Sequence, residues 1–273
     1  MSADHVPMDP GLLTAVAALA RRAGSAIMDI YVGGFDVTRK ADASPVTAAD
    51  LAADRVILAG LAELTPGIPV LTEETQAPSW EERREWRRYW LVDPLDGTRE
   101  FVKRNGEFTV NIALIEDHRP VLGVVLAPVS GDLYAAARDI GAMREAVPGA
   151  IPQPITTRKA MLPLRVAGSR SHGSARQLAM LERIGAHELM PLGSSLKFCV
   201  IARGDADLYL RLGPTSEWDT AAAQCVLEEA GGSLVDLDGQ AFRYNTRDSL
   251  LNPEFIASGD RSIDWAARMG VAS

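Results

Sequence analysis

Residues 89–98 read YWLVDPLDGT, an apolar run that ends in two aspartates and a turn. The first four residues have the composition of a buried strand, and the turn follows its C-terminal end. Asp93 and Asp96 can converge on one point there, and the carbonyl oxygen of Leu95 can join them. Oxygen ligands of this kind suit Mg²⁺ or Mn²⁺ better than zinc. The alternative interpretation is an ordinary Asp-Gly turn that ends a strand.

Two further acidic sites favour the metal interpretation. Glu73 follows a short apolar segment, 68–71, and Asp219 lies at the start of a later helical stretch. Taken alone, the first is typical of a solvated loop and the second of a helix cap. If these groups met Asp93 and Asp96, like charges about 4 Å apart would repel by about 4 kcal/mol per pair at an effective dielectric of 20. A divalent cation is the simplest compensation, so the pattern predicts a metal site.

Groups that can bind phosphate stand beside these acids. Gly97 and Thr98 can present backbone N–H groups at a turn, and the threonine adds a hydroxyl. Residues 47–50, TAAD, resemble a helix capping box with aspartate in place of glutamate. Helix capping is one interpretation of Asp50, and help in holding a nucleophilic water is the other.

Apolar periodicity predicts the elements of the first half. A helix should start at Pro10 and stop near Gly33, and a second should follow the TAAD segment to about Leu64. We expect the charged segment 81–88 to be a solvated helical surface. Three strands should then form an antiparallel meander, with Pro120 and Gly131 in the turns, at residues 108–115, 121–126 and 133–137.

The second half has a different pattern. Residues 148–163 contain four prolines and mark the expected boundary between an N-terminal α+β lobe, 1–150, and a C-terminal α/β lobe, 151–273. Beyond the boundary, strands and helices alternate, which is typical of α/β layering. The expected strands are 164–167, 187–191, 206–210, 233–236 and 254–257, and the expected helices are 174–184, 195–203 and 217–230.

Composition excludes several classes of protein. A formal charge of −8 and a pI near 5.1 argue against binding to nucleic acid or an anionic membrane through bulk attraction. Cys199 and Cys225 are too few for a disulfide framework, and we expect both to be buried in helix faces. Since neither a signal peptide nor a long apolar run is visible, the simplest location is a reducing cytoplasm.

The acidic elements, in their order, resemble the inositol monophosphatase superfamily. They are LTEET (71–75), DPLDGT (93–98) and EWDTAA (217–222), and the resemblance extends from about residue 11 to 260. Within the superfamily the chain is most similar to the CysQ branch, the 3′(2′),5′-bisphosphate nucleotidases. The stretches that carry this similarity are SPVTAAD (44–50), NGEFTVNIALIE (105–116), SRSH (169–172), GSSLKFC (193–199), YLRLGPTSEWD (209–219) and LLNPEFIASG (250–259).

The resemblance implies a layered αβαβα sandwich and a metal-dependent hydrolase. Its metal ligands would be Glu73, Asp93 and the Leu95 carbonyl for one Mg²⁺, and Asp93, Asp96 and Asp219 for a second. The number of ions is two or three, and Mn²⁺ is an alternative. Glu73 and Thr98, with Asp50 nearby, would orient and deprotonate the attacking water, while the N–H groups of Gly97 and Thr98 would hold the phosphate.

The implied reaction is hydrolysis of the 3′-phosphate of adenosine 3′,5′-bisphosphate to AMP and phosphate, in the service of sulfate assimilation. Ser194, Lys197 and Arg211 match positions that hold nucleotide phosphate or sugar in this branch, and His172 matches one near the base and ribose. The family also implies inhibition by Li⁺. Peripheral association with the inner face of the inner membrane, as for some relatives, and a homodimer are two partner hypotheses that the sequence leaves open.

Two other functions stay open on the sequence alone. One is an inositol-phosphate or sugar-phosphate monophosphatase with the same metal site but a different alcohol half. The other is a Mg²⁺-dependent binding module that has lost turnover. Lys197 and Arg211 favour the nucleotidase over the first, because a second phosphate needs cationic partners that inositol 1-phosphate does not.

Overall fold

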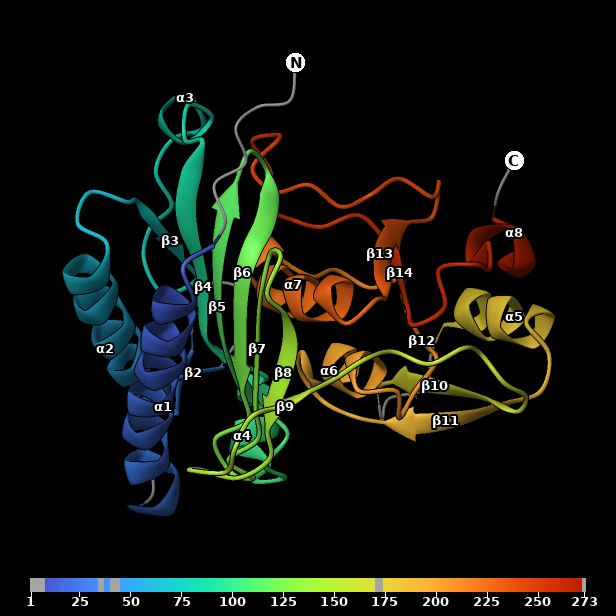
Figure 1. Cartoon of the computed structure of the whole chain (residues 1–273), viewed down its shortest axis with the longest axis horizontal. Coiled ribbons are helices and arrows are strands. Elements are labelled where there is room, and N and C mark those ends of the chain that lie inside the picture. Colours follow the sequence, from blue (N-terminus) through green and yellow to red (C-terminus); the bar gives the residue numbers. More distant parts are fainter. Residues whose placement is uncertain (1–7, 34–36, 40–44, 170–173, 272–273) are drawn as a thin grey trace.

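The chain folds into five alternating layers of helices and sheets. A computed structural model describes residues 8–33, 37–39, 45–169 and 174–271. In Figure 1 the layers follow one another from the N-terminal helices, through a large sheet and a central helix pair, to a smaller sheet and two outer helices. This confirms the αβαβα sandwich that the resemblance implies.

The large sheet has seven strands in the order β3-β4-β5-β6-β7-β8-β9. Only its first pair is parallel, and the others form an antiparallel meander. The expected meander is therefore confirmed, with two additional strands at its far edge. The strands are β3 (Val70–Thr72), β4 (Arg88–Asp96), β5 (Thr109–Glu116), β6 (Arg119–Leu126), β7 (Leu133–Ala137), β8 (Gly141–Glu145) and β9 (Gln153–Pro154).

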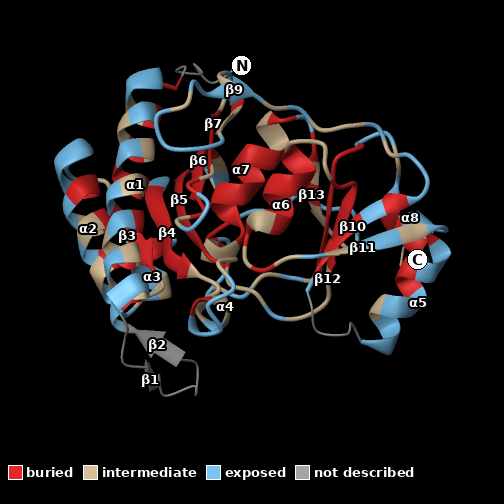
Figure 2. Ribbon diagram, turned by 90° about the horizontal axis from the view of Figure 1, so that it is seen from below, coloured by how far each residue is buried: buried red, intermediate tan, exposed pale blue. Residues whose placement is uncertain are grey.

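One face of this sheet is covered by α1 (Pro10–Gly33) and α2 (Ala48–Leu64). Figure 2 shows the buried residues of α1, in red, on the face turned to the sheet; its large ones are Leu13, Val16, Leu19 and Ile27. These two helices and the strands form one apolar cluster. Before α2 lies a short antiparallel pair, β1 (Val37–Arg39) and β2 (Pro45–Thr47).

The opposite face packs against α6 (Leu196–Ala202) and α7 (Ala221–Glu229), which lie between the two sheets. Cys199 and Cys225 are buried in these helices, as expected. Gly123 of β6 lets α7 approach closely, since a Cβ there would overlap the carbonyl of Ala222 and lie 2.7 Å from the Cβ of Cys225.

The smaller sheet has the order β11-β10-β12-β14-β13, with a parallel half and an antiparallel half. Helices α5 (Ala175–Arg183) and α8 (Trp265–Met269) close its outer face around a third apolar cluster. The strands are β10 (Leu164–Gly168), β11 (His187–Pro191), β12 (Leu208–Arg211), β13 (Ser233–Asp236) and β14 (Phe255–Ser258).

Three local expectations are wrong at least in part. Most of the charged segment 81–88 is exposed, as expected, but it is only partly helical, because α3 ends after Trp80–Arg83, and Arg83 is buried. Pro120 lies inside β6, while the turn is made by Asp117 and His118 with φ values of 46° and 67°.

The third difference concerns the expected helix 217–230. It is divided into a 3₁₀ turn, η1 (Glu217–Asp219), and α7, with Thr220 between them. Asp219 therefore lies in a separate turn before the helix. The lobe boundary near 148–163 remains a prediction.

Candidate metal and phosphate site

A bulge in β4 brings two predicted metal ligands to the same face of the large sheet. Asp93 pairs with Asn111 and Asp96 with Thr109, so three steps along β4 match two along β5. In a regular strand, side chains three residues apart point to opposite faces. The extra residue in the Pro-Leu segment restores the same face for both aspartates.

Three carboxylates from separate parts of the chain meet at this end of the sheet. Glu73 follows β3, Asp93 belongs to β4 and Asp219 ends η1, and one oxygen from each lies within 4.8 Å of the other two. Asp219 also keeps the capping role, because the Ser216 N–H donates to its Oδ2 at 2.8 Å. The metal and capping interpretations of this residue are thus compatible.

Asp96 and Asp50 lie beside this trio without being part of it. The Oδ2 of Asp96 accepts a hydrogen bond of 2.6 Å from the Ser195 N–H. Asp50 is 3% exposed, in the first turn of α2, and it raises the pKa of Asp93 by repulsion. All five acidic residues expected at the site therefore lie in one electrostatic cluster.

The pKa values of these acids show the cost of burying like charges together. Burial, and then repulsion from Glu73, Asp96 and the other acids, raises the pKa of Asp93 well above its usual range. Burial also raises the pKa of Asp96 to about 6, although Lys197 and the Ser195 N–H oppose the shift. For Asp219, burial and then repulsion from Asp96 raise the pKa to about 8.

These carboxylates fit a hard divalent cation. Without one, part of the cluster must bind protons at neutral pH, as the raised pKa values show. A cation that fully ionises the cluster would relieve the repulsion, and oxygen-only donors suit Mg²⁺ or Mn²⁺. Leu95 is buried between the two aspartates, and its N–H donates to Asp93 Oδ1 at 3.0 Å.

The predicted phosphate cradle lies at the end of the bulge. Gly97 has φ of 93°, a left-handed conformation that glycine adopts without strain, and it precedes the short helix α4 (Thr98–Val102). The Thr98 hydroxyl lies 3.5 Å from the Leu95 carbonyl oxygen. Both cradle residues are thus adjacent to the acids.

A polar cavity of about 250 Å³ opens beside Asp96 and Asp219. Ser194, Lys197 and Arg211 all line it, as the resemblance implies for the substrate. Ser194 has an unusual positive φ of 44°. The remaining polar or charged lining residues include Arg99, Glu100, Lys103, Glu107 and Thr215.

Among the four cationic side chains that line the cavity, Lys197 and Arg211 differ in their surroundings. Lys197 is 6% exposed; its Nζ donates to the Ser194 carbonyl at 2.5 Å, and burial lowers its pKa to about 8 although Asp96 opposes this. Arg211 donates to the carbonyls of Gly213 and Pro214 at 3.2 and 3.0 Å. It also lines a neighbouring, more apolar cavity of about 550 Å³. His172 lies outside the described residues.

Buried hydroxyl and amide groups surround Asp96 that were not predicted from the sequence. Thr109, Asn111 and Ser195 are each at most 1% exposed and are bonded to one another. A signal for two of them existed, because Thr109 and Asn111 alternate with apolar residues at the start of β5, at the register positions of the two aspartates.

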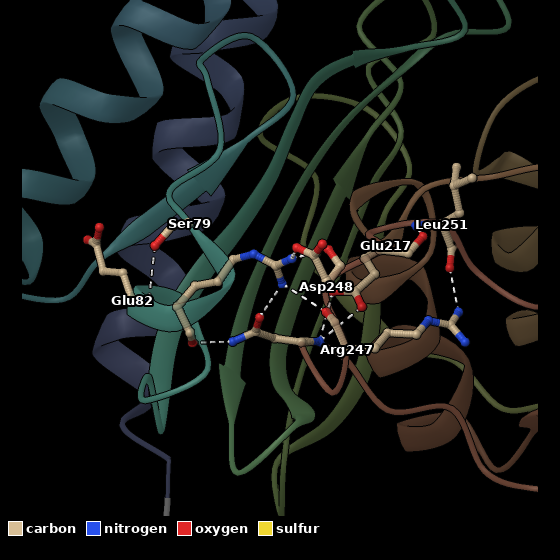
Figure 3. A network of polar contacts seen from close by, with 9 residues as sticks. Ser79, Glu82, Glu217, Arg247, Asp248 and Leu251 are labelled. Atoms are coloured by element: carbon tan, nitrogen blue, oxygen red, sulfur yellow. Dashed lines mark hydrogen bonds and ion pairs between the residues drawn. The ribbon is translucent and has the colours of Figure 1, made fainter.

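A second set of residues that the sequence did not predict forms a hydrogen-bond network around the turn that carries Asp219. Arg83 donates to Asn245 Oδ1 at 2.6 Å and to the carbonyls of Arg247 and Asp248. The Asn245 N–H in turn donates to both carboxylate oxygens of Glu217, at 3.0 and 2.9 Å. Figure 3 shows this network, which links the segment after Glu73 to η1. Burial raises the pKa of Glu217 to about 7.

Residues 9–267 match the sequence profile described as the inositol monophosphatase family. The chain is 52% identical, over 249 residues, to a protein named 3′(2′),5′-bisphosphate nucleotidase CysQ from Escherichia coli (strain K12); the match covers 90% of this chain and 99% of that one. A protein of the same name from Haemophilus influenzae is 37% identical over 93% of this chain and 95% of its own length.

Solved structures agree with these sequence comparisons. The crystal structure of CysQ from Bacteroides thetaiotaomicron, described as a bacterial member of the inositol monophosphatase family, superposes with a TM-score of 0.79 at 39% identity. It covers 91% of this chain and 97% of its own. An inositol monophosphatase from Anabaena (Nostoc) sp. PCC 7120 has a TM-score of 0.72 at 22% identity, covers 96% of each chain and shows the same fold.

Proposed function

This chain belongs to the inositol monophosphatase family, and we propose that its acidic site removes the 3′-phosphate of adenosine 3′,5′-bisphosphate, releasing AMP and phosphate. The enzyme is a 3′(2′),5′-bisphosphate nucleotidase, a phosphoric monoester hydrolase, like the curated relatives that are 52% identical to it. The observation that carries the chemistry is the meeting of Glu73, Asp93 and Asp219 within 4.8 Å.

The donor set suggests how the site would hold magnesium. Glu73, Asp93 and the Leu95 carbonyl would bind one ion, and Asp93, Asp96 and Asp219 a second; a third ion, or Mn²⁺, is compatible with the same acids. When bound, such ions supply positive charge that stabilises the charge developing on the attacking and leaving oxygens of an in-line displacement.

The remaining residues act on water and on the scissile phosphate. We assign Glu73 and Thr98, with Asp50 nearby, to orient the attacking water and accept its proton. The N–H groups of Gly97 and Thr98 are assigned to the phosphate oxygens. The position of these two N–H groups supports the assignment, because the left-handed Gly97 turns the chain immediately after Asp96.

The second phosphate and the nucleoside determine which substrate the enzyme prefers. Lys197 and Arg211 supply cationic groups in the cavity beside the acids, and Ser194 supplies a hydroxyl. We assign the first two to the 5′-phosphate and Ser194 to phosphate or sugar. His172 is assigned to the base and ribose from the sequence resemblance alone.

A phosphate-release panel tests the proposal. With Mg²⁺, the substrates are adenosine 3′,5′-bisphosphate, 3′-phosphoadenosine 5′-phosphosulfate, inositol 1-phosphate and fructose 1,6-bisphosphate. We expect the highest kcat/KM for the adenosine bisphosphate and no turnover in excess EDTA. A higher kcat/KM for inositol 1-phosphate would favour the monophosphatase alternative, and metal binding without phosphate release would favour the non-catalytic module.

Several wider properties are proposed from the sequence pattern and the family resemblance. They are inhibition by Li⁺, a cytoplasmic location with peripheral association at the inner membrane, homodimer formation, and a lobe boundary near residue 150. Among the described residues, no helix is long and apolar enough to cross a membrane. Inhibition assays, vesicle flotation and sedimentation of the purified protein would test the first three, and limited proteolysis the boundary.

A further inference from the structure

Three buried polar side chains form a connected group behind Asp96. The Ser195 Oγ lies 2.7 Å from Asn111 Oδ1 and 2.8 Å from Thr109 Oγ1. The Thr109 Oγ1 in turn lies 3.5 Å from Asp96 Oδ2. Thr109 and Asn111 come from β5, and Ser195 directly precedes α6. The group therefore links the large sheet to the central helix layer at the proposed metal site.

The number of available protons shows that one of the two orientations of the Asn111 side-chain amide leaves hydrogen-bonding groups without partners. With Oδ1 of Asn111 toward Ser195, the single hydroxyl proton of Ser195 is donated to the amide. Thr109 must then donate its own proton to Ser195, so it has none for Asp96. In this orientation the Asn111 Nδ2 is buried and lacks a hydrogen-bond partner within the described part of the chain.

The opposite amide orientation connects every group in one direction. The oxygen and nitrogen of an asparagine amide have nearly the same shape, so the hydrogen-bond pattern decides between them. With Nδ2 toward Ser195, the amide donates to the serine hydroxyl, which donates to Thr109. The threonine proton is then directed at Asp96 Oδ2, and the buried donor has a partner.

We infer that Asn111, Ser195 and Thr109 form a directed chain of hydrogen-bond donors that ends on Oδ2 of Asp96 and orients this carboxylate for the metal. The Ser195 N–H donates to the same oxygen, at 2.6 Å. Two donors on Oδ2 would hold the carboxylate in one orientation and leave its Oδ1 available to a cation. Asn111 and Thr109 are thus positioning residues, and this inference rests on the proposed metal role of Asp96.

The composition of β5 supports a role at the site over a role in folding. The intervening residues Val110 and Ile112 are fully buried in the apolar cluster under α1 and α2. Apolar residues at 109 and 111 would pack as well in a strand buried on both faces. Polar groups at these two positions are needed only where β5 lies opposite Asp93 and Asp96.

Metal binding by single variants tests the chain of donors. Mn²⁺ binding is measured by electron paramagnetic resonance, and Mg²⁺ binding by calorimetry, for the unaltered protein and for Thr109→Val, Asn111→Leu and Ser195→Ala. The last variant keeps the backbone N–H bond to Asp96. We expect each to weaken metal affinity by about 10-fold or more, as is usual when a partner of a metal ligand is removed. Thr109→Ser, which keeps the hydroxyl, should bind within about 3-fold of the unaltered protein.

The double variant Thr109→Val/Asn111→Leu separates positioning from general loss of packing. The amide of Asn111 acts on Asp96 only through the two hydroxyls. We therefore expect Asn111→Leu to reduce metal affinity much less in the Thr109→Val background than in the unaltered protein. Ser258→Ala is the control, since it removes a buried hydroxyl that bonds to Ser233 in the other sheet. Its metal affinity should not change.

The outcomes distinguish this inference from the proposed function. Normal metal binding by Thr109→Val and Ser195→Ala, or fully multiplicative losses in the double variant, would overturn the chain of donors alone. If the unaltered protein bound neither ion, the metal site itself would be wrong. Should Thr109→Val fail to fold, the smaller change Ser195→Ala breaks the same chain and is judged by the same criterion.

Discussion

Glu73 and Asp219 present carboxylate oxygens within 4.8 Å of each other, although one follows the third strand and the other precedes the seventh helix. Asp93 completes the trio from β4. The charge that these groups share makes the site costly to fold without a counterion. Most properties that can be measured on this enzyme should therefore depend on what neutralises it.

The first prediction concerns the pH dependence of stability without metal. The pKa values of Asp96 and Asp219 in the folded chain are about 6 and about 8, above the usual value near 4. The folded state thus binds protons that the unfolded state releases, and it loses stability as pH rises between about 4 and 8. In EDTA the thermal midpoint should fall over this range, and saturating Mg²⁺ should remove most of the fall.

Asp219→Asn gives the matched test of that explanation. The amide cannot titrate, so the fall in the midpoint in EDTA should become smaller, while kcat/KM should drop by about 100-fold or more because a metal ligand is weakened. A midpoint in EDTA that rises with pH for the unaltered protein would contradict the assigned pKa shifts.

The second prediction concerns the buried guanidinium of Arg83. Arg83→Met leaves Asn245 Oδ1 and two backbone carbonyls without their donor, so we expect the free energy of unfolding to fall by about 2–4 kcal/mol. Urea denaturation measures it. The control is Arg87→Met, whose exposed pair with Asp117 should contribute almost nothing. Equal effects of the two changes would show that the network of Figure 3 adds no stability.

The third prediction concerns substrate choice. Arg211→Ala should lower kcat/KM for adenosine 3′,5′-bisphosphate by about 10- to 100-fold, the effect of losing one charge-assisted hydrogen bond. A substrate with a single phosphate should be affected by less than about 3-fold, because it does not use this cation. Arg176→Ala, which removes a partly exposed pair with Glu254, is the control. The same loss of kcat/KM for both substrates would show that Arg211 does not bind the second phosphate.

The fourth prediction concerns the close approach of β6 and α7. Gly123→Ala places a methyl group against the Ala222 carbonyl and Cys225, and we expect a loss of about 1–3 kcal/mol in the free energy of unfolding. Since α7 follows Asp219 almost directly, the Mg²⁺ concentration for half-maximal activity should also rise. Gly33→Ala, where a Cβ meets nothing within 4 Å, should change neither. If Gly123→Ala left the free energy of unfolding unchanged, α7 would be able to move away from β6 at little cost.

The sequence failed where distant segments changed the meaning of a local pattern. Segment 81–88 has the composition of a solvated helix and is mostly exposed, yet Arg83 is buried and donates to the carbonyls of residues 247 and 248. Thr109 and Asn111 looked like ordinary members of a strand. Thr109 contacts Asp96 directly, but Asn111 is connected to it only through Ser195, which belongs to the other half of the chain.

What the sequence by itself determined is local and periodic: the long helix α1, the antiparallel meander, the alternation of the second half and the identity of the acidic residues. Apolar spacing and turn residues specify such features within a few residues of each other. The tertiary structure alone decided which oxygens meet, because the bulge in β4 and the packing of α7 set the distances among Glu73, Asp93 and Asp219. Register and packing arise from contacts between distant segments, and a linear pattern does not contain them.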